Sequence, residues 1–432
     1  MIEVQLVVIG DWHLAYCTAV SFSHSGVKTI LKLSHHGDGH DKAQRSSSEK
    51  TLEPGTPSCP IQEPGFEDLV QEGRNQNTLF HTRDWSGFHA TVWWLAVDTP
   101  VDDQDMPQTE VLVRTLEEGF QFGRKPLVLA VSSQVPVGFC RKLQERFGTP
   151  VAYVPENLRL GQGIETFYRA DRTVIGADDL EAGVCVRKLM GEFPTEFLMT
   201  NLATAEMVKH ATNFFLAMSI SYANELARIG QRFGVDHAFI TSALKADKRI
   251  GPFAYVKPGL GFAGGTLPRD LRVLQGLGQE LNVPVPVTDA VLKVNEQVDD
   301  VILDRIDELR RAGKSEKSVL LMGYSYKADV DTVRRSPAER LARHLHANGY
   351  SVYGYDPIMN GKDLGDLPKV LRHCSDLNEV PATCSLFVVV TPRPAFKELN
   401  WNARPGLTVF DLHGFFKAKD RQSGPTWVGL WE

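Results

Sequence analysis

Short apolar runs and helix-compatible segments alternate along the first 155 residues of the chain. Each run has the length and composition of a buried strand. The runs are VQLVVIG at 4–10, TILKL at 29–33, TVWWLAV at 91–97, PLVLAVSS at 126–133 and PVAYVP at 150–155. Because strands that alternate with helices are typical of a parallel, doubly wound sheet, we predict an α/β domain over residues 1–199.

The period of the pattern changes at Thr200. Apolar residues then recur three or four positions apart, at 208, 211, 215, 218, 222, 226 and 229. This spacing predicts a long helix with one broad apolar face, which suits a spine between domains and a dimer surface. Further helical patterns run through 272–312. We therefore predict an all-α central domain over residues 200–312.

A strand pattern returns in the last part of the chain. Its runs are SVLLMGYSYKA at 318–328, YSVYGYDP at 350–357, SLFVVVTP at 385–392 and TVFDL at 408–412. They predict a second α/β domain over residues 313–432. The predicted fold class is α/β, with two Rossmann-like, doubly wound parallel-sheet domains joined by a long central helix and an all-α middle domain.

Composition and charge exclude several classes of function. The 432 residues carry a formal net charge of -6, so there is no basic excess to bind nucleic acid. The sequence has no apolar stretch of about 18 residues and no leader pattern, which predicts a cytoplasmic protein without membrane contact. The six cysteines lie far apart without a CxxC pair, and we predict neither a disulfide framework nor a metal site. His35, His36 and His40 fall in a polar stretch from Ser34 to Pro60 that is typical of a solvated loop.

Four polar residues are candidates for chemistry. Lys209 and Asn213 are four positions apart on the predicted long helix, so they project from one face and can converge on one ligand group. Glu156 follows a predicted strand, at the edge where open α/β sheets bind ligands. Asp270 ends the glycine-rich run GFAGGTLPRD at 261–270, whose backbone can approach a ligand closely. Taken singly, each residue is equally well explained as a solvated or a capping side chain.

The order and spacing of the motifs resemble the UDP-glucose/GDP-mannose dehydrogenase family over nearly the whole chain. The motifs that carry the resemblance are IQEPG at 61–65, DTP at 98–100, SSQVPVG at 132–138, PENLRLG at 155–161, TAEMVKHATN at 204–213, KRIGPF at 248–253, PGLGFAGGTLPRD at 258–270, GYSYKADVDTVRRSP at 323–337 and YDP at 355–357.

The resemblance implies an enzyme that oxidises the primary alcohol at carbon 6 of a nucleotide-linked hexose to a carboxylate and passes two hydrides to NAD. It also implies a homodimer built on the long helix, in which Arg249 reaches a substrate in the partner subunit. In the roles that the resemblance implies, Lys209 and Asn213 stabilise the oxyanion, Asp270 orders or activates water, and Glu156 assists hydrolysis. The implied cofactor residues are Gly10, Trp12, Thr99, Ser133 and Arg334. The implied substrate residues are Arg249, Phe262, Gly264 and Lys327.

Two motifs depart from the family pattern. The nucleophilic cysteine of the family aligns with Thr266, whose hydroxyl is a poorer nucleophile and whose branched carbon crowds attack, so we predict that oxidation through a thioester fails. The turn after the first strand reads GDWHLA at 10–15, where a dinucleotide site needs further glycines. Trp12 stands where the pyrophosphate would approach and Asp11 adds negative charge, so we predict that NAD does not bind in its usual pose.

These departures lead to one main hypothesis and two alternatives. The main hypothesis is a divergent member that binds a nucleotide sugar or a similar ligand but has lost or changed its redox function. The first alternative is an active NAD-dependent dehydrogenase of altered scope, which takes a UDP-sugar alcohol to the aldehyde. The second is a non-redox enzyme, a hydrolase, lyase or transferase, that uses the lysine and the aspartate as acid and base.

Overall fold

A computed structural model gives the fold of the chain in two compact units, Met1–Ala211 and Thr212–Glu432. The division falls inside the helix α7 (Leu202–Gly230), and each unit is described by itself. The structure describes residues 2–34, 52–61, 63–102, 105–122, 125–156, 158–159, 161–313, 316–326, 333 and 336–431.

The first unit contains a nine-stranded sheet in the order β3-β4-β2-β1-β5-β6-β7-β8-β9. Its strands are β1 (Ile2–Ile9), β2 (Thr29–Lys32), β3 (Glu53–Pro54), β4 (Leu79–Thr82), β5 (Phe88–Leu95), β6 (Val128–Val131), β7 (Val151–Tyr153), β8 (Arg172–Ala177) and β9 (Glu196–Thr200). The pairs β3–β4 and β7–β8 are antiparallel, and all the other neighbours are parallel. The central strand β1 is flanked on both sides, with Leu6 opposite Thr29 of β2 and Val92 of β5.

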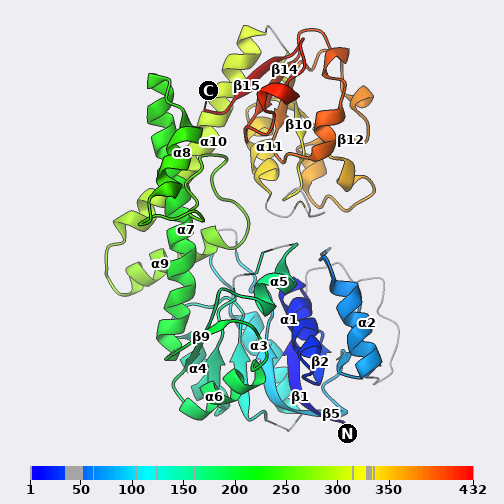
Figure 1. The fold of residues 1–432 in the computed structure, drawn as a ribbon, viewed down its shortest axis with the longest axis vertical. Coiled ribbons are helices and arrows are strands. Elements are labelled where there is room, and N and C mark those ends of the chain that lie inside the picture. The colour runs from blue at the N-terminus through cyan, green and yellow to red at the C-terminus, as the bar shows by residue number, and fades with distance from the viewer. Residues whose placement is uncertain are drawn as a thin grey trace. The chain divides into compact units, whose positions relative to one another are not determined.

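Helices cover both faces of this sheet (Figure 1). The helices of one face are α1 (His13–His24), α2 (Phe66–Gln76), α5 (Gly163–Tyr168) and α6 (Leu180–Leu189), and those of the other are α3 (Glu110–Gln121), α4 (Phe139–Phe147) and the first turns of α7. Successive strand residues point to opposite faces of the sheet and so pack in different hydrophobic cores, as Val8 and Ile9 of β1 do. This three-layer arrangement confirms the predicted doubly wound α/β fold.

The second unit begins with helices and ends with another sheet. Its helices after α7 are α8 (His237–Ala246), α9 (Leu267–Glu280), α10 (Pro286–Ala312) and α11 (Pro337–Ala347). The sheet has six strands, β10 (Ser318–Met322), β11 (Ser351–Tyr355), β12 (Arg372–Cys374), β13 (Leu386–Val389), β14 (Thr408–Asp411) and β15 (Thr426–Gly429). All its pairs are parallel, in the order β12-β11-β10-β13-β14-β15, which confirms the second Rossmann-like sheet.

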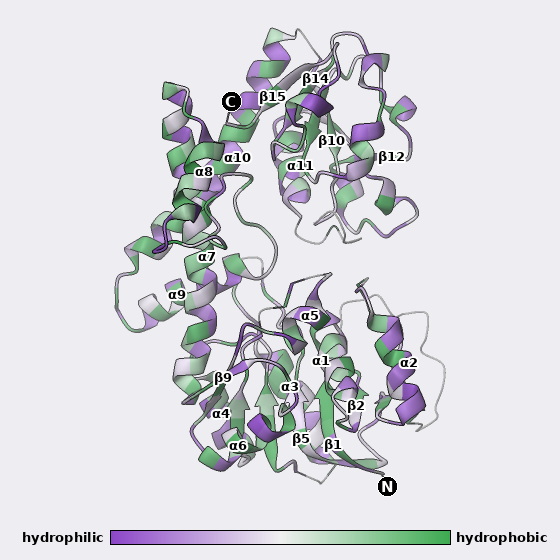
Figure 2. Ribbon diagram, viewed as in Figure 1, coloured by the Kyte–Doolittle hydropathy of each residue, from purple (hydrophilic) through white to green (hydrophobic). Residues whose placement is uncertain are grey.

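The long helix α7 is present as predicted, but its apolar face is not the buried one. Phe215, Tyr222 and Ile229, seven positions apart, are 58%, 48% and 57% exposed. The buried side of α7 instead carries small and polar residues, among them Glu206, Lys209, His210, Asn213, Ala217, Ser221, Asn224 and Ala227. In Figure 2 the helix accordingly shows hydrophobic and hydrophilic bands along its length, whereas β1 is hydrophobic.

Two predictions about the layout of the chain are not settled by the fold. The division into domains at 199 and 312 stays a prediction, because the contacts separate two units rather than three. His35, His36 and His40 lie outside the described residues. Within the described part of the chain, no helix has both the length and the apolar character that crossing a membrane requires.

Candidate functional site

The glycine-rich run at 261–270 folds into a loop that is fixed to α10. Asn295 of α10 accepts a hydrogen bond from the Phe262 amide at 2.7 Å and donates one to the Phe262 carbonyl at 3.0 Å. Gly264 has φ +86, and a side chain there would lie 2.7 Å from the hydroxyl of Tyr326. Only glycine fits this backbone and this close approach. The backbone at Phe262 and Gly264 is therefore held in one place, and their role at the substrate stays a prediction.

Asp270 is completely buried in the first turn of α9, which follows this loop. The amide nitrogen of Asn213, on α7, donates a hydrogen bond to its carboxylate. The positive end of the α9 dipole also favours a negative charge at this position. Thr266, at the N-cap of α9, is exposed, and its hydroxyl does not cap the helix. Asn213 and Asp270, which were predicted separately as site residues, are thus hydrogen-bonded to each other, and Thr266 presents its side chain to solvent.

Lys209 and Glu156 form a second buried contact, in the first unit. The Lys209 ammonium donates to the backbone carbonyl of Glu156, and Lys209 is 6% exposed. Burial raises the pKa of the Glu156 carboxyl to about 8, although the positive charge of Lys209 acts in the opposite direction. A carboxyl with such a pKa is largely protonated at neutral pH and can exchange a proton there.

In the turn between β1 and α1, the backbone at Gly10 lies very close to neighbouring atoms. A side chain at Gly10 would come within 2.6 Å of the Ala96 carbonyl oxygen and 2.8 Å of the Ala15 methyl carbon. Trp12 is the N-cap of α1 in an extended conformation, and its carbonyl accepts the amides of Ala15 and Tyr16. The first amides of any helix have no acceptor within the helix, so this end of α1 offers donors to an anion. The close backbone approach that a dinucleotide site needs is therefore present at Gly10.

Thr99 and Ser133 use their hydroxyls within the protein. The Thr99 hydroxyl donates to the Gln134 carbonyl at 2.8 Å, and the Ser133 hydroxyl donates to the Val97 carbonyl at 2.8 Å. The two residues are 2% and 0% exposed. They join the chain segments that leave β5 and β6, so they shape the carboxyl edge of the sheet.

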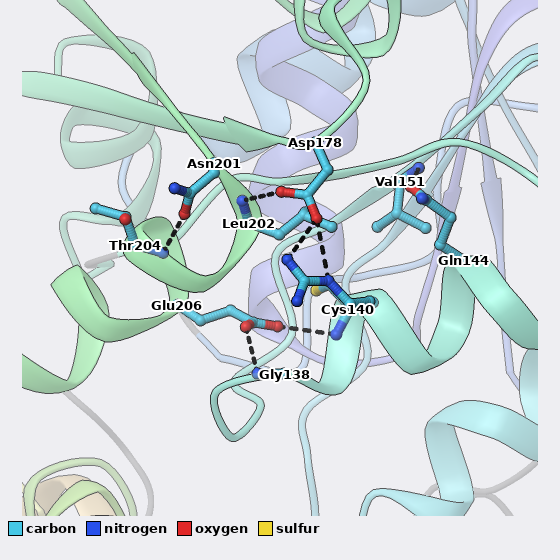
Figure 3. Close-up of polar contacts among 10 residues, drawn as sticks. Gly138, Cys140, Gln144, Val151, Asp178, Asn201, Leu202, Thr204 and Glu206 are labelled. Atoms are coloured by element: carbon cyan, nitrogen blue, oxygen red, sulfur yellow. Dashed lines mark hydrogen bonds and ion pairs between the residues drawn. The ribbon is translucent and has the colours of Figure 1, made fainter.

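Glu206 of α7 is a functional candidate that the sequence analysis missed. Its buried carboxylate accepts the amides of Gly138 at 2.6 Å and Cys140 at 2.8 Å (Figure 3). Gly138 is the N-cap of α4 and has no side chain to satisfy these donors, so a residue from another helix caps α4. One turn later on α7, a ring nitrogen of His210 bonds the Val135 carbonyl at 3.0 Å. Together the two side chains hold the VPVG loop at 135–138.

Removal of the Glu206 carboxylate is expected to loosen this loop. Glu206→Ala leaves two buried amides without an acceptor, which destabilises the local fold by about 1–3 kcal/mol. We expect faster hydrogen exchange in peptides that cover residues 132–147, measured by mass spectrometry. Arg141→Ala is the matched control, because it removes only the exposed ion pair with Asp178 from the same helix. Equal exchange in wild type and Glu206→Ala would contradict the capping role.

The second unit contains a cavity of about 500 Å³. It is lined by the 254–261 segment and by residues just beyond the carboxyl ends of β10, β13 and β14, among them Tyr326, Thr391 and His413. Ligands of open parallel sheets bind at this edge. Lys245 and Lys257 also line the cavity, and Lys257 donates to the His413 carbonyl at 3.1 Å. Their charges suit an anionic ligand.

A buried ion pair holds the segment that leads to Tyr326, one of the residues that line this cavity. Arg393 donates to the Asp356 carboxylate at 2.9 Å and to the Ser325 hydroxyl at 2.6 Å. The same carboxylate accepts the backbone amides of Tyr324 at 2.9 Å and Ser325 at 3.1 Å. These contacts fix the segment that leaves β10 and leads to Tyr326.

Of three further predicted residues, one lies apart from the cavity and two lie outside the described residues. Arg249 is exposed and is paired with Asp247 at 2.7 Å. Lys327 and Arg334 lie outside the described residues. The predicted roles of these side chains therefore stay predictions.

Comparison with known proteins finds one family over most of the chain. Three models of the UDP-glucose/GDP-mannose dehydrogenase family match, the NAD binding domain at 46–194, the central domain at 203–297 and the UDP binding domain at 320–418. The UDP-glucose 6-dehydrogenase TuaD of Bacillus subtilis (strain 168) is 29% identical over 408 residues, 91% of this chain and 85% of that protein. A UDP-glucose 6-dehydrogenase of Pseudomonas aeruginosa is 26% identical over 453 residues, 99% of this chain and 97% of that protein.

A solved structure has the same fold. The UDP-glucose dehydrogenase of Pyrobaculum islandicum superimposes with a TM-score of 0.83 at 25% identity, over 99% of this chain and 98% of that one.

Proposed function

Because the chain belongs to the UDP-glucose/GDP-mannose dehydrogenase family, we propose that it is an NAD-dependent dehydrogenase that oxidises the sugar alcohol of a nucleotide sugar. One observation carries this proposal: two buried pairs, Lys209 with Glu156 and Asn213 with Asp270, place a cation, a titratable carboxyl and a carboxylate–amide pair at the motifs that the family shares. The cavity with Lys245 and Lys257 supports an anionic nucleotide as the carrier of the sugar.

The prediction of a lost or changed redox function is wrong. The relatives and the solved structure that resemble this chain are dehydrogenases, and nothing about them points to lost redox chemistry. The physical reason lies in the turn at 10–15. The prediction weighed the side chains of Trp12 and Asp11, whereas the groups that receive a pyrophosphate are backbone amides, and the close passage at Gly10 is kept. The alternative of an active dehydrogenase is the one that we adopt.

The residues of the first unit fit a bound NAD. Gly10 and the first amides of α1 would receive the pyrophosphate, and the carboxyl edge of β5 and β6, shaped by Thr99 and Ser133, would receive the nicotinamide end. When bound, the cofactor supplies a hydride acceptor. The protein positions the pyrophosphate and the nicotinamide end of the cofactor.

The protein's own groups then account for proton movement and charge. Lys209 places a positive charge where an alcohol oxygen gains negative charge as its proton leaves. Glu156, with a pKa of about 8, is able to take up or release a proton near neutral pH. Asp270, fixed by Asn213, can orient water or a substrate hydroxyl.

Thr266 limits the extent of the oxidation. A second oxidation through a thioester needs a thiol at this position, and a threonine hydroxyl does not replace it. We therefore propose the aldehyde as the product, with one equivalent of NADH per sugar.

We expect UDP-glucose and NAD to give NADH with the purified protein, followed by absorbance. Lys209→Ala should lower kcat by about 10²–10³-fold, because a stabilising charge is lost from the transition state. Lys142→Ala removes an exposed lysine of α4 and should leave kcat unchanged. Absence of NADH formation with UDP-glucose and with other UDP-hexoses would contradict the proposal, and equal loss in both variants would contradict the role of Lys209.

The Trp12 indole is expected to weaken cofactor binding without abolishing it. Trp12→Gly opens the approach to the α1 amides, so the Kd for NAD should fall several-fold when measured by calorimetry. Trp85→Phe, on the same unit but in a buried aromatic cluster with Trp93, should leave this Kd unchanged. A Kd that stays the same or rises in Trp12→Gly would show that the indole does not stand in the path.

A homodimer is part of the same proposal. The stripe of Phe215, Tyr222 and Ile229 on α7 exposes large apolar side chains at heptad spacing, which suits packing against a second copy of the helix. We expect light scattering to give the mass of two chains for the wild type. Phe215→Glu should give a single chain, whereas Phe122→Glu, at the C-cap of α3 and 60% exposed, should stay dimeric. A wild-type mass of one chain would contradict this part of the proposal.

A further inference from the structure

Three metal-ligating side chains meet in the core of the first unit, below the turn at 10–15. His13 is the first residue of α1, Cys17 follows one turn later on the same helix face, and Glu63 precedes α2. The ring nitrogen Nε2 of His13 lies 2.7 Å from Glu63 Oε2 and 3.4 Å from Cys17 Sγ. All three residues are buried, and their ligating atoms lie within 4.8 Å of one another.

One ring nitrogen thus faces two partners. In a neutral histidine, Nε2 either carries the proton or accepts one, so it cannot both donate to the carboxylate and accept from the thiol. With the proton on Nε2 the ring donates to Glu63, and the Cys17 thiol then faces a nitrogen that has no lone pair to offer. A protonated Nε2 can then only share its single proton between the carboxylate and the weakly accepting sulfur of Cys17.

We propose that His13, Cys17 and Glu63 form a zinc site. Zinc takes nitrogen, sulfur and carboxylate oxygen at about 2.0–2.3 Å, so in a tetrahedral site neighbouring ligand atoms lie about 3.3–3.6 Å apart. The distance between Cys17 and His13 already falls in this range, and Glu63 needs to withdraw from His13 by only about 0.6 Å. The ion then takes the place of the proton between the three ligating atoms.

The surroundings of Glu63 support a ligand role. Its other oxygen, Oε1, lies 3.3 Å from the amide of Ile164, which donates to it and leaves Oε2 directed at His13. Such a contact from outside the ligand set orients a carboxylate for a metal. The neighbouring residue Gly163 leaves the space: a side chain there would lie 2.6 Å from His13 and 2.8 Å from Cys17.

The charges of the three side chains also favour a bound metal ion. A thiolate and a carboxylate together neutralise a divalent cation, so no net charge is buried. The pattern is two ligands four residues apart on α1 and a third, Glu63, from a distant segment. The sequence analysis missed it because it looked for CxxC pairs and histidine clusters, and Glu63 lies 50 positions from His13.

All three ligating residues are buried, so such a site would stabilise the local fold. The ion would link Glu63 to His13 and Cys17 at the start of α1. It would therefore stabilise the end of the helix that we propose binds the cofactor's pyrophosphate. The inference does not depend on the proposed dehydrogenase activity.

The test is metal content and metal spectroscopy of the full-length protein. We expect about one zinc ion per chain after purification in zinc-supplemented medium, and a thiolate-to-cobalt charge-transfer band when cobalt replaces zinc. Cys17→Ser and Glu63→Gln should each lose at least tenfold in zinc affinity in competition with a chelator. Cys185→Ser, which changes a half-buried thiol on α6, should keep both the zinc and the band.

Two results would overturn the proposal. One is a wild-type protein that binds neither zinc nor cobalt while its circular dichroism shows that it is folded. The other is unchanged zinc affinity in Cys17→Ser. Should Cys17→Ser fail to fold, Glu63→Gln, which keeps size and shape, gives the same measurement.

Discussion

The buried polar face of α7 is the constraint on which the candidate site depends. A polar group inside a protein destabilises the fold unless it has a partner, so each of these side chains has to be met by a nearby segment. In the first unit Glu206, Lys209 and His210 hold the α4 amides, the Glu156 carbonyl and the Val135 carbonyl. In the second unit Asn224 accepts the Gly259 amide at 2.8 Å, and the Ser221 hydroxyl donates to Val291 at 3.0 Å. The same helix thus fixes several of the loops that carry the family's motifs.

This arrangement explains why the apolar side chains of α7 face outward. The side of α7 that the fold buries is occupied by the polar residues that contact the loops, so the large apolar residues lie on the other side. The apolar residues at 215, 222 and 229 are left to be covered from outside the chain. One helix therefore carries both the contacts that hold these loops and an exposed apolar stripe.

The pattern of the sequence predicted the two sheets and the long helix, because strand and helix periods are local properties. The motifs indicated Asn213 and Asp270 as site residues, but not the hydrogen bond between them. The cap by Glu206 could not be predicted either, since its amide partners lie 66 and 68 positions away and glycine gives no side-chain signal. The burial of the polar face of α7 was also missed. The spacing of apolar residues shows that a helix has two different faces, but it does not show which face the tertiary fold covers. The loss of redox function was wrongly predicted from two side chains in a turn whose ligand contacts are made by backbone.

The ion pair between Arg393 and Asp356 has a consequence for how this chain can change over evolutionary time. The aspartate serves the guanidinium and two backbone amides at once, so any replacement of it leaves a buried positive charge and open donors together. Loss of the arginine leaves an uncompensated carboxylate instead, and either single step is strongly destabilising. The two positions are therefore expected to change only as a pair, so the segment that leads from β10 to Tyr326 should keep its conformation while residues that line the cavity vary.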